Sequence, residues 1–521
     1  MSSVLKAAGL IGLLALISKV IGLLREIIIN NYYGTSYIRD AYVYASAFPL
    51  AFALIMLAGL NGPFHSSVVT VISKYKAQGR IDDTKTTITT ITIISTIIMT
   101  IITFLSIKFA PEVIAWTTSP DLPIKTRDLA IEQLMIMSPI FIVSGLIGIS
   151  YGILNIEKVY LAPSLSPVMA SISIIVALLI ASPENGAVAL AWGTLIGATL
   201  QLVLQIISML PTIKNYFNFK FDIKHSGVRD IFRTLLPATL SSTIGQINLI
   251  ITGYFASGME EGAISAIYSS NLIYQLPLGI MLTALLVPML PVLSQSFIKN
   301  DNKIEFKKNI NRAVRSLIFL SIPLSAILIC SGQLFTKMLF ERGAFTEHST
   351  LITYQCLITT AIGMVFYAIR DLLVRVFYAM DNAATPFYTT IFSILSITFF
   401  CWLFTHYFHL QADGIALAVS FVTTLNMGIL GYTLYRKIGN WVEIETVKQF
   451  VKISITTIPV VIFCLFFNYM VDYKYNWFIF GIYTVLMSFL GIACIGFLRY
   501  LKDQEIIDIT DSIMKKLKLK R

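Results

Sequence analysis

The chain has 521 residues, of which 13% are charged and 56% are apolar, and its mean hydropathy is +0.77. Because soluble domains carry about 25% charged residues, this composition excludes a disordered chain, a disulfide-stabilised secreted domain and an ordinary cytosolic enzyme. It predicts an integral membrane protein. The five cysteines are far apart in apolar stretches, so neither a zinc knuckle nor a redox pair is expected.

Apolar runs long enough to cross a bilayer, at about 20 residues each, recur along the whole chain. They are apolar on all sides, whereas barrel strands alternate apolar and polar residues, so an all-α polytopic membrane protein is predicted. The first run continues past Lys19 without a small-residue cleavage site, which indicates a span and not a removable signal peptide. The fourteen predicted spans are 5–33, 41–73, 86–107, 129–154, 161–182, 187–210, 233–256, 263–295, 313–330, 351–379, 387–408, 412–435, 449–470 and 476–499.

The distribution of lysine and arginine predicts the orientation of these spans, because the cytoplasmic loops of membrane proteins are enriched in both. If the N-terminus is cytoplasmic, the inner segments hold 28 of the 39 basic residues, the outer loops hold seven and the spans hold four. Both termini are therefore expected on the cytoplasmic side. The net charge of +11 follows from this topology and from contact with lipid, so no nucleic-acid partner is expected.

Several short motifs recur about 228 residues apart, in the same order, across six spans. This regularity indicates duplication of a six-span unit. Because six is an even number, both copies have the same orientation, and they are expected to be related by an axis along the membrane normal. The matched pairs are Pro49 and Pro277, Pro63 and Pro291, 186–191 and 414–418, and, at a slightly shorter offset, 151–155 and 377–381.

The duplication predicts two pseudo-symmetric six-helix lobes plus two extra C-terminal helices. Two such lobes would enclose a cavity and alternate its access by rocking. The long second and eighth spans contain internal glycine and proline, which is typical of broken helices lining such a cavity, although kinks for packing give the same pattern. The expected parts are an N-lobe (1–210), a cytoplasmic linker (211–232), a C-lobe (233–436), two further helices (437–500) and a basic cytoplasmic tail (501–521), either an interfacial helix or merely solvated.

Ionisable side chains within the spans are candidate substrate ligands, because a charge at the bilayer centre costs about 2.5–3.5 kcal/mol unless it faces water or a partner. Lys19, Arg25 and Glu26 lie in the first span. Asp40 opens the second span, where it could pair with Arg25 or Arg39. Two cations against one acid favour an anion-binding wall for a phosphate-bearing substrate. The alternative is ion pairing that holds helix ends together, with Glu26 and Asp40 as orienting partners.

The tenth span offers Arg370 and Arg375 as a second cationic wall. Asp371 and Arg375 are four residues apart, so an internal ion pair is the alternative. His65, near the end of the second span, could titrate near neutral pH or be a packed polar group. No nucleotide-binding loop, metal cluster or nucleophile–base pair is recognised, so neither an enzyme nor a cofactor is expected. Transport would then be coupled to the membrane potential or to a monovalent cation.

Five segments resemble the signature motifs of one family, the MurJ/MviN lipid II flippases of the multidrug/oligosaccharidyl-lipid/polysaccharide exporter superfamily. The resemblance covers nearly the whole chain. It implies fourteen helices in two lobes, with a two-helix extension whose groove suits a lipid tail. It also implies a cavity lined by charged residues of the first helix, and an undecaprenyl-pyrophosphate-linked disaccharide-peptide as the substrate. The segments are 17–26, 40–42, 274–279, 340–346, and 375–380 with Thr385-Pro386.

Two departures from the family pattern affect the substrate site. The second helix of the family usually carries arginines after its proline, where this chain has the apolar residues 50–55. The eighth helix usually carries an arginine where this chain has Leu272. The pyrophosphate is therefore expected to be held by fewer cations, with help from Asn61, Asn271 or Gln275, or else the substrate differs.

The function expected from these features is translocation of lipid II from the inner to the outer leaflet by alternating access, for peptidoglycan synthesis, cell-wall biogenesis and cell shape. The expected location is the bacterial cytoplasmic (inner) membrane, where the chain would act as a monomer in contact with membrane lipids. The alternatives are an exporter of another lipid-linked glycan, a cation-coupled small-molecule exporter, and a non-transporting membrane scaffold.

Overall fold

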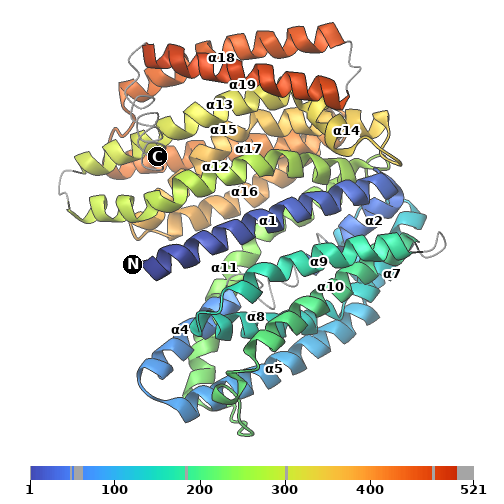
Figure 1. The fold of residues 1–521 in the computed structure, drawn as a ribbon, viewed down its shortest axis with the longest axis vertical. Helices are drawn as coiled ribbons and strands as arrows, with labels where there is room; N and C mark the ends of the chain where they lie inside the picture. The colour runs from blue at the N-terminus through green and yellow to red at the C-terminus, as the bar shows by residue number, and fades with distance from the viewer. Residues whose placement is uncertain are drawn as a thin grey trace. The chain divides into compact units, whose positions relative to one another are not determined.

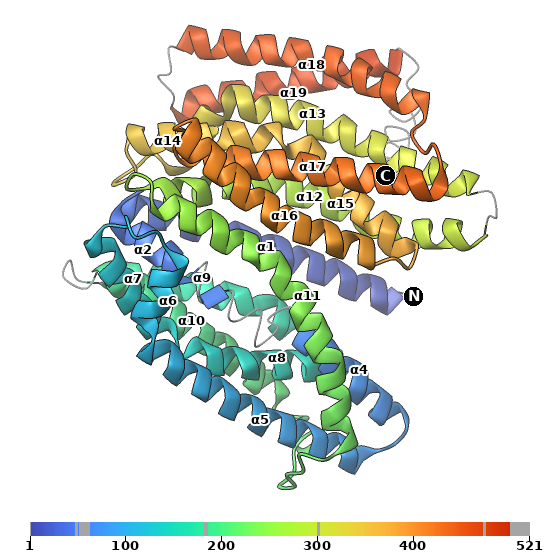
Figure 2. The same cartoon turned by 180° about the vertical axis from the view of Figure 1, so that it is seen from behind.

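The computed structural model describes residues 2–46, 50–51, 63–181, 186–299, 303–471 and 476–500. Within these ranges every regular element is a helix and no strand occurs, which confirms the predicted all-α fold (Figure 1, Figure 2). Asn61 and the basic tail 501–521 lie outside the described residues.

The helices of the first half follow the predicted spans to within a few residues at most ends. The fourth predicted span is divided into α7 and α8, and the short helix α6 was not predicted. The elements in chain order are α1 (Ser2–Tyr33), α2 (Tyr37–Ala45), α4 (Pro63–Ala77), α5 (Ile81–Lys108), α6 (Ala110–Thr117), α7 (Ile124–Met137), α8 (Ile140–Ile156), α9 (Leu161–Ile180), α10 (Gly186–Met209), the 3-10 turn Ile213–Asn215 and α11 (Ser226–Ser257).

The helices of the second half also follow the predicted spans. The ninth span, predicted over 313–330, belongs to the much longer helix α13. Hydropathy does not detect the polar first turns of this helix. The elements are α12 (Ala263–Lys299), α13 (Ile304–Phe340), α14 (Glu347–Ile362), α15 (Met364–Ala379), α16 (Ala384–Trp402) with the π turn Leu403–Tyr407, α17 (Ala412–Ile438), α18 (Ile444–Val471) and α19 (Trp477–Tyr500).

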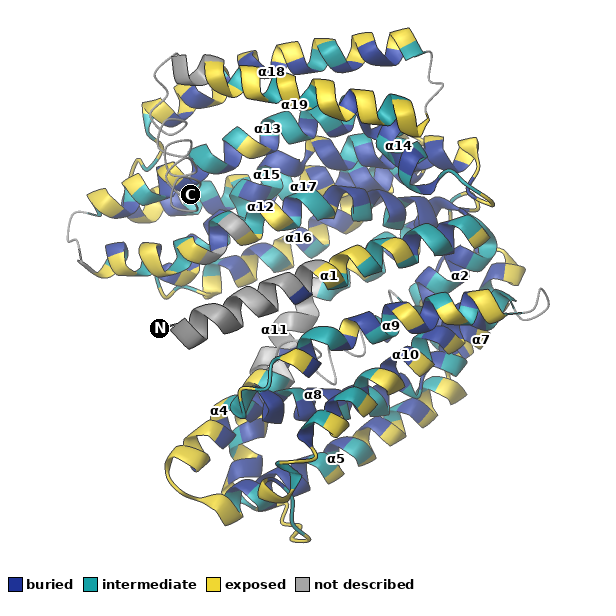
Figure 3. Cartoon of the chain, in the orientation of Figure 1, coloured by how far each residue is buried: buried dark blue, intermediate teal, exposed yellow. Residues whose placement is uncertain are grey.

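Eight of the described helices are long and apolar enough to cross a membrane. The number of candidate spans rises to as many as eleven if each bent helix pair counts as one span. α19 is the most apolar of the eight, and only 6% of its most apolar stretch is buried. Exposed residues recur along the stretch Trp477–Gly496 of this helix (Figure 3). Such a helix is stable only against lipid. The described helices are consistent with fourteen crossings, and that number stays a prediction.

Two spans are bent at matching positions of the two halves. α7 and α8 meet at 43° across Ser138 and Pro139, and α14 and α15 meet at 48° across Gly363. Proline removes a backbone donor and clashes with the preceding turn, whereas glycine lowers the cost of leaving the helical path. Positions 138 and 363 are 225 residues apart, close to the spacing of the repeated motifs. The bends therefore agree with the predicted duplication.

The helix pair α9 and α10 packs closely, because two glycines remove the side chains between them. A Cβ atom at Gly193 would lie 2.8 Å from the Cα of Ile174, and one at Gly197 would lie 2.7 Å from the Cα of Ala170. Small residues four apart allow helix backbones to approach in a membrane, where packing replaces the hydrophobic effect.

A polar contact joins the last two helices of each half, α9 with α10 and α16 with α17. Asn426 Nδ2 of α17 donates to Ser393 Oγ of α16 at 2.8 Å. Gln205 Nε2 of α10 donates to Ser166 Oγ of α9 at 3.1 Å. All four residues are buried. Both halves therefore use an amide-to-hydroxyl hydrogen bond to join their last two helices, as two copies of one unit would.

The boundary between the two compact units of the structure differs from the boundary between the two predicted repeats. α11, which the repeat assigns to the C-lobe, packs against α4 and α5. Val228 and Ile231 of α11 are buried in the same apolar cluster as Tyr75 of α4. This shared core places α11 in the first of two compact units. The first unit is Met1–Ser265 with Arg342–Ala344, and the second is Ala266–Glu341 with Phe345–Arg521.

The extension formed by α18 and α19 is attached to α13. Tyr483 Oη of α19 donates to Ser331 Oγ at 2.8 Å, and Asn468 Nδ2 of α18 donates to the carbonyl of Cys330 at 2.7 Å. Ser331 and Tyr483 are buried, so these bonds form in an apolar surrounding where unpaired polar groups are costly. The extension is therefore fixed at a defined position on the second unit.

Candidate substrate-binding site

Glu26 of α1 is the centre of a buried ion cluster. Its carboxylate accepts hydrogen bonds from Nη2 of Arg25 at 2.6 Å, from Nε of Arg25 at 3.1 Å, and from Nη2 of Arg39 on α2. Glu26 and Arg39 are 3% and 1% exposed, whereas the side chain of Arg25 keeps 24% of its exposure. Two guanidinium groups share the carboxylate of this cluster. Arg25 is its accessible part.

Asp40 holds the beginning of α12. Its carboxylate accepts hydrogen bonds from the backbone nitrogens of Gly262 at 2.6 Å and Ser265 at 3.1 Å, and from the Ser265 hydroxyl. These nitrogens lie at a helix N-terminus, where a negative charge is stabilising. Asp40 therefore serves as a helix cap, where a pair with Arg25 or Arg39 was expected. It is an orienting residue, one of the two roles that the sequence left open.

Lys19 lies on the exposed part of α1, six residues before Arg25. Its neighbour Val20 is 51% exposed and Leu24 is 49% exposed, so the exposed surface of α1 here is largely apolar. α1 packs mainly against α9. An exposed ammonium group on an apolar surface attracts anions over a low-dielectric background, where charges interact more strongly. Lys19 is therefore available to bind a ligand, and its role as a ligand stays a prediction.

His65 of α4 is engaged with α8. His65 Nε2 lies 2.6 Å from Nδ2 of Asn155, and its ring contacts the ring of Tyr151 edge to face at 4.6 Å between centroids. An amide nitrogen only donates, so Nε2 accepts and the imidazole is neutral in this arrangement. His65 is thus a packed polar group, which was one of the two roles predicted for it.

The remaining candidates lie in the second unit. Arg375 Nη2 is 3.4 Å from Oδ2 of Asp371, which confirms the predicted pair within one helix. Arg370 is half-buried beside them on α15. On α12, Asn271 is half-buried and Gln275 is exposed. The pairing of Arg375 with Asp371 favours a structural role for that arginine over a second cationic wall.

An apolar groove runs along the extension of the second unit. It lies between α13, α18 and α19 and has a volume of about 300 Å³. At Gly491 of α19 an added Cβ would have no neighbour within 4 Å, so the groove is open there. The residues that line it are Phe319, Leu320, Pro323, Leu324, Ile327, Ile453, Thr456, Thr457, Val460, Met487, Gly491, Cys494 and Ile495.

The motif at 340–346 has a structural explanation. Gly343 has φ of 58°, and a Cβ there would lie 2.3 Å from the carbonyl oxygen of Asn31 at the end of α1. Ala344 donates its backbone N–H to the same carbonyl at 2.9 Å. Only glycine combines this backbone conformation with so close an approach. The motif therefore fixes the C-terminal end of the helix that carries Lys19 and Arg25.

The predicted spans leave Arg39 in an outer loop, whereas the structure places it inside α2. Ser36 precedes the first turn of α2 as its N-cap residue, and Asp40 is in that first turn. A small polar residue followed by an acid is a helix-start signal, which could have placed Arg39 inside the helix.

Among the described residues, no group of three or more His, Cys, Asp or Glu side chains could hold a metal ion.

The helical arrangement is shared with a solved membrane protein. A structure of a multidrug resistance MATE family transporter of the MOP superfamily, in an inward-facing conformation, matches 81% of this chain and 95% of its own with a TM-score of 0.69. The two sequences are 16% identical. This likeness shows that the two proteins share a fold.

The chain belongs to the lipid II flippase MurJ family, whose model matches residues 29–486. A Synechocystis sp. protein described as a probable lipid II flippase MurJ is 34% identical over 456 residues, which are 84% of each chain. The lipid II flippase MurJ of Burkholderia cenocepacia is 27% identical over 379 residues, with 71% and 72% covered. A solved lipid II flippase MurJ in an inward closed conformation matches with a TM-score of 0.78 and 27% identity, covering 94% of this chain and 99% of that one.

Membership of this family confirms the resemblance found in the sequence motifs. It also identifies the chain as a multi-pass bacterial membrane protein of a transporter family. The match extends from the end of α1 into α19, so it includes both halves of the repeat and both helices of the extension.

Proposed function

We propose that this chain moves lipid II from the inner to the outer leaflet by alternating access. The family match over residues 29–486 carries this proposal. It includes α13, α18 and the first turns of α19, whereas Lys19 and Arg25 precede it. A lipid-linked substrate has two ends to bind. The two ends differ in chemistry. The pyrophosphate is a compact anion that needs cations, and the polyprenyl tail needs an apolar surface.

The cations for the pyrophosphate are Lys19 and Arg25. Arg25 is partly exposed in its cluster with Glu26 and Arg39, while Lys19 is exposed on the same helix. Arginine offers a planar fork to phosphate, and lysine offers a point charge. Arg39 and Glu26 are buried, so they orient Arg25 and do not bind the ligand. We expect the amides of Asn271 and Gln275 to contribute as well.

The groove between α13, α18 and α19 supports a lipid tail. Its lining is apolar apart from the hydroxyls of Thr456 and Thr457 and the thiol of Cys494. Both threonine hydroxyls donate to backbone carbonyls of their own helix, so they present no unsatisfied polar group to a hydrocarbon chain. Such a groove keeps a prenyl chain in an apolar surrounding while the polar head crosses the membrane.

Net transfer needs a driving force, because both leaflets present the same head group and binding alone shifts no equilibrium. We propose that the membrane potential or a monovalent cation resets the transporter. One elementary charge moved across 100 mV corresponds to about 2.3 kcal/mol. We also propose that both termini are cytoplasmic, as the 28 to seven distribution of basic residues favours, and that the protein acts as a monomer in the inner membrane.

Depletion of the protein in its own cell tests the function directly. Lipid II at the outer leaflet is followed by its accessibility to an external reagent that cannot cross the membrane, in cells without a redundant flippase. The expected result is loss of the outer pool and accumulation of the inner pool. An outer pool that fills at the normal rate would overturn the proposal. Loss of a different lipid-linked glycan would identify the other exporter class.

Purified protein in liposomes gives the second test. Lipid II flipped in the absence of any other protein excludes a scaffold, because a scaffold cannot move the substrate alone. Liposomes with an imposed potential are compared with liposomes without one. A rate that is unaffected by the potential and by monovalent cations would contradict the proposed coupling, while the transport proposal itself would stand.

A further inference from the structure

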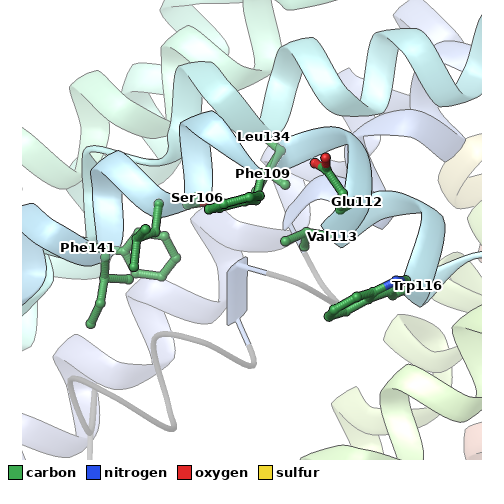
Figure 4. Close-up of a pocket in the computed structure, with 9 residues that line it drawn as sticks. Ser106, Phe109, Glu112, Val113, Trp116, Leu134 and Phe141 are labelled. Atoms are coloured by element: carbon green, nitrogen blue, oxygen red, sulfur yellow. The ribbon is translucent and has the colours of Figure 1, made fainter.

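A second apolar groove lies in the first unit, where α5, α6, α7 and α8 come together. It has a volume of about 560 Å³, within the range of small-molecule sites. Its wall is formed mainly by apolar side chains, among them Ile102, Leu105, Phe109 and Leu134. Figure 4 shows Trp116 at one end and Phe141 at the other, with Glu112 and Val113 beside Trp116. The groove is therefore elongated, with one charged group near one end.

The end that carries the charge lies at a membrane interface. α5 ends at Lys108, and α6 begins two residues later with Pro111 and Glu112 in its first turn. Trp116 is 82% exposed and Phe109 is 43% exposed. Exposed tryptophan at the end of a span is typical of the head-group level of a bilayer. The groove therefore extends from head-group level toward the apolar interior, and the proposed orientation assigns it to the outer leaflet.

The polar groups at the groove have distinct roles. Ser106 Oγ is hydrogen-bonded with Ser138 Oγ at 2.9 Å, so it is already engaged. Glu112 is exposed and presents a carboxylate. Lys108 Nζ lies 5.4 Å from the centroid of the Phe109 ring, which is part of the groove wall. Lys108 and Glu112 thus precede and follow Phe109 in the chain, and Glu112 lines the apolar groove.

We propose that this groove binds a phospholipid whose head group carries a primary ammonium, such as phosphatidylethanolamine. One acyl chain occupies the groove, the ammonium group pairs with the carboxylate of Glu112, and the phosphate pairs with the ammonium group of Lys108. This charge pattern fits a zwitterionic head group. It does not fit the transported substrate, whose pyrophosphate would be repelled by the carboxylate. The site is therefore a bulk-lipid site, distinct from the residues proposed for transport.

Native mass spectrometry of the full-length protein, with phosphatidylethanolamine or phosphatidylcholine of identical chains, tests the proposal. A primary ammonium can donate hydrogen bonds to Glu112, whereas a quaternary one cannot. The parent protein should bind phosphatidylethanolamine about threefold better, as expected for an interfacial ion pair. Glu112→Gln should remove this preference. Glu132→Gln, at an exposed carboxylate of α7 that does not line the groove, should keep it.

A second variant tests the acyl-chain part of the site. Val113→Phe narrows the groove and should weaken binding of both lipids, without changing the preference between them. Equal binding of the two lipids by the parent protein, or an unchanged preference in Glu112→Gln, would overturn the proposal.

Discussion

Glu26 of α1 and Arg39 of α2 form an ion pair that is almost fully withdrawn from solvent, and Arg25 shares the same carboxylate. A buried pair stabilises a fold weakly as a whole, but removing one partner leaves an uncompensated charge that costs about 3–5 kcal/mol. The pair therefore makes the junction of the first two helices sensitive to single substitutions and tolerant of paired ones.

Glu26→Gln should lower the melting temperature of the detergent-purified protein strongly, because Arg39 then remains buried without a full counter-charge. Glu26→Gln combined with Arg39→Gln should melt higher than Glu26→Gln alone. Asp371→Asn is a matched control, since its partner Arg375 is 30% exposed and an exposed pair contributes about 1 kcal/mol or less. A double variant no more stable than the single one would contradict the buried-charge argument.

Lys19→Ala should abolish lipid II flipping while leaving protein level and melting temperature near normal, because Lys19 is exposed and its proposed role is to bind the anion. Loss of one charge-assisted hydrogen bond, about 1.5–3 kcal/mol, corresponds to a decrease of tenfold or more in substrate affinity. Lys19→Arg should retain transport. Lys308→Ala, at an exposed lysine of α13, is the control and should have no effect. Normal flipping by Lys19→Ala would remove Lys19 from the site.

Gly491→Leu should reduce transport by filling the groove between α13, α18 and α19. No atom lies within 4 Å of an added Cβ at this position, so the change should not destabilise the protein. Within a helix, replacing glycine by leucine is favourable by up to about 1 kcal/mol. Gly481→Leu is the matched control, since Gly481 is equally open on α19 but does not line the groove. Flipping rates in liposomes that fall equally in both variants would argue against a tail site in this groove.

Gly197→Ala should destabilise the contact between α9 and α10. The new methyl group would lie 2.7 Å from the Cα of Ala170, and backbone cannot move aside as a flexible side chain can. Overpacking of this kind costs about 1–3 kcal/mol. Gly428→Ala on α17, where the added Cβ meets nothing within 4 Å, should leave stability unchanged or raise it slightly. The melting temperatures of the two variants, measured under identical conditions, give the comparison.

The pair of Lys76 and Glu157, outside the predicted spans, should give the stability a pH dependence. Lys76 Nζ is 2.6 Å from Oε1 of Glu157, which also accepts a hydrogen bond from Tyr216. Burial raises the pKa of Glu157, but the hydrogen bonds from Lys76 and Tyr216 outweigh it and hold that pKa below the ordinary value of 4.5. Burial, followed by the hydrogen bond to Glu157, raises the pKa of Tyr216 to about 12.

A carboxylate with a lowered pKa stabilises the fold above its unfolded pKa, and the contribution is lost as the pH falls through the folded value. A phenol with a raised pKa stabilises below its unfolded pKa, and the contribution is lost as the pH rises through about 12. The melting-temperature difference between the parent and Glu157→Gln should therefore be largest near neutral pH and shrink below about pH 4. Because Lys76 is 50% exposed, the effect should be below about 1 kcal/mol. A difference that grows on acidification would contradict the pairing.

Most of the helices could be predicted from the sequence because each contains a continuous apolar run, and continuous runs are a local property. The bend between α7 and α8 could not, since Ser138 and Pro139 interrupt the direction of the helix without interrupting its hydropathy. The helix α6 is eight residues long, too short for a window that searches for spans.

Partners in the site were predictable where they lie close together in the sequence. Asp371 and Arg375 are one helical turn apart, so their pair follows from spacing alone. Glu26 and Arg39 belong to different helices, and Asp40 caps a helix more than 220 residues away. Such contacts depend on tertiary packing, which no periodicity in one sequence encodes.

The bends of α7–α8 and α14–α15 show that one change of backbone direction can be reached through different residues. One occurs at Pro139 and the other at Gly363, yet the angles are 43° and 48°. A ring that cannot continue the helical hydrogen bonds and a residue without a side chain therefore give nearly the same result. A substitution at either bend should accordingly be judged by the direction it gives to the following helix, and not by its chemical likeness to the residue it replaces.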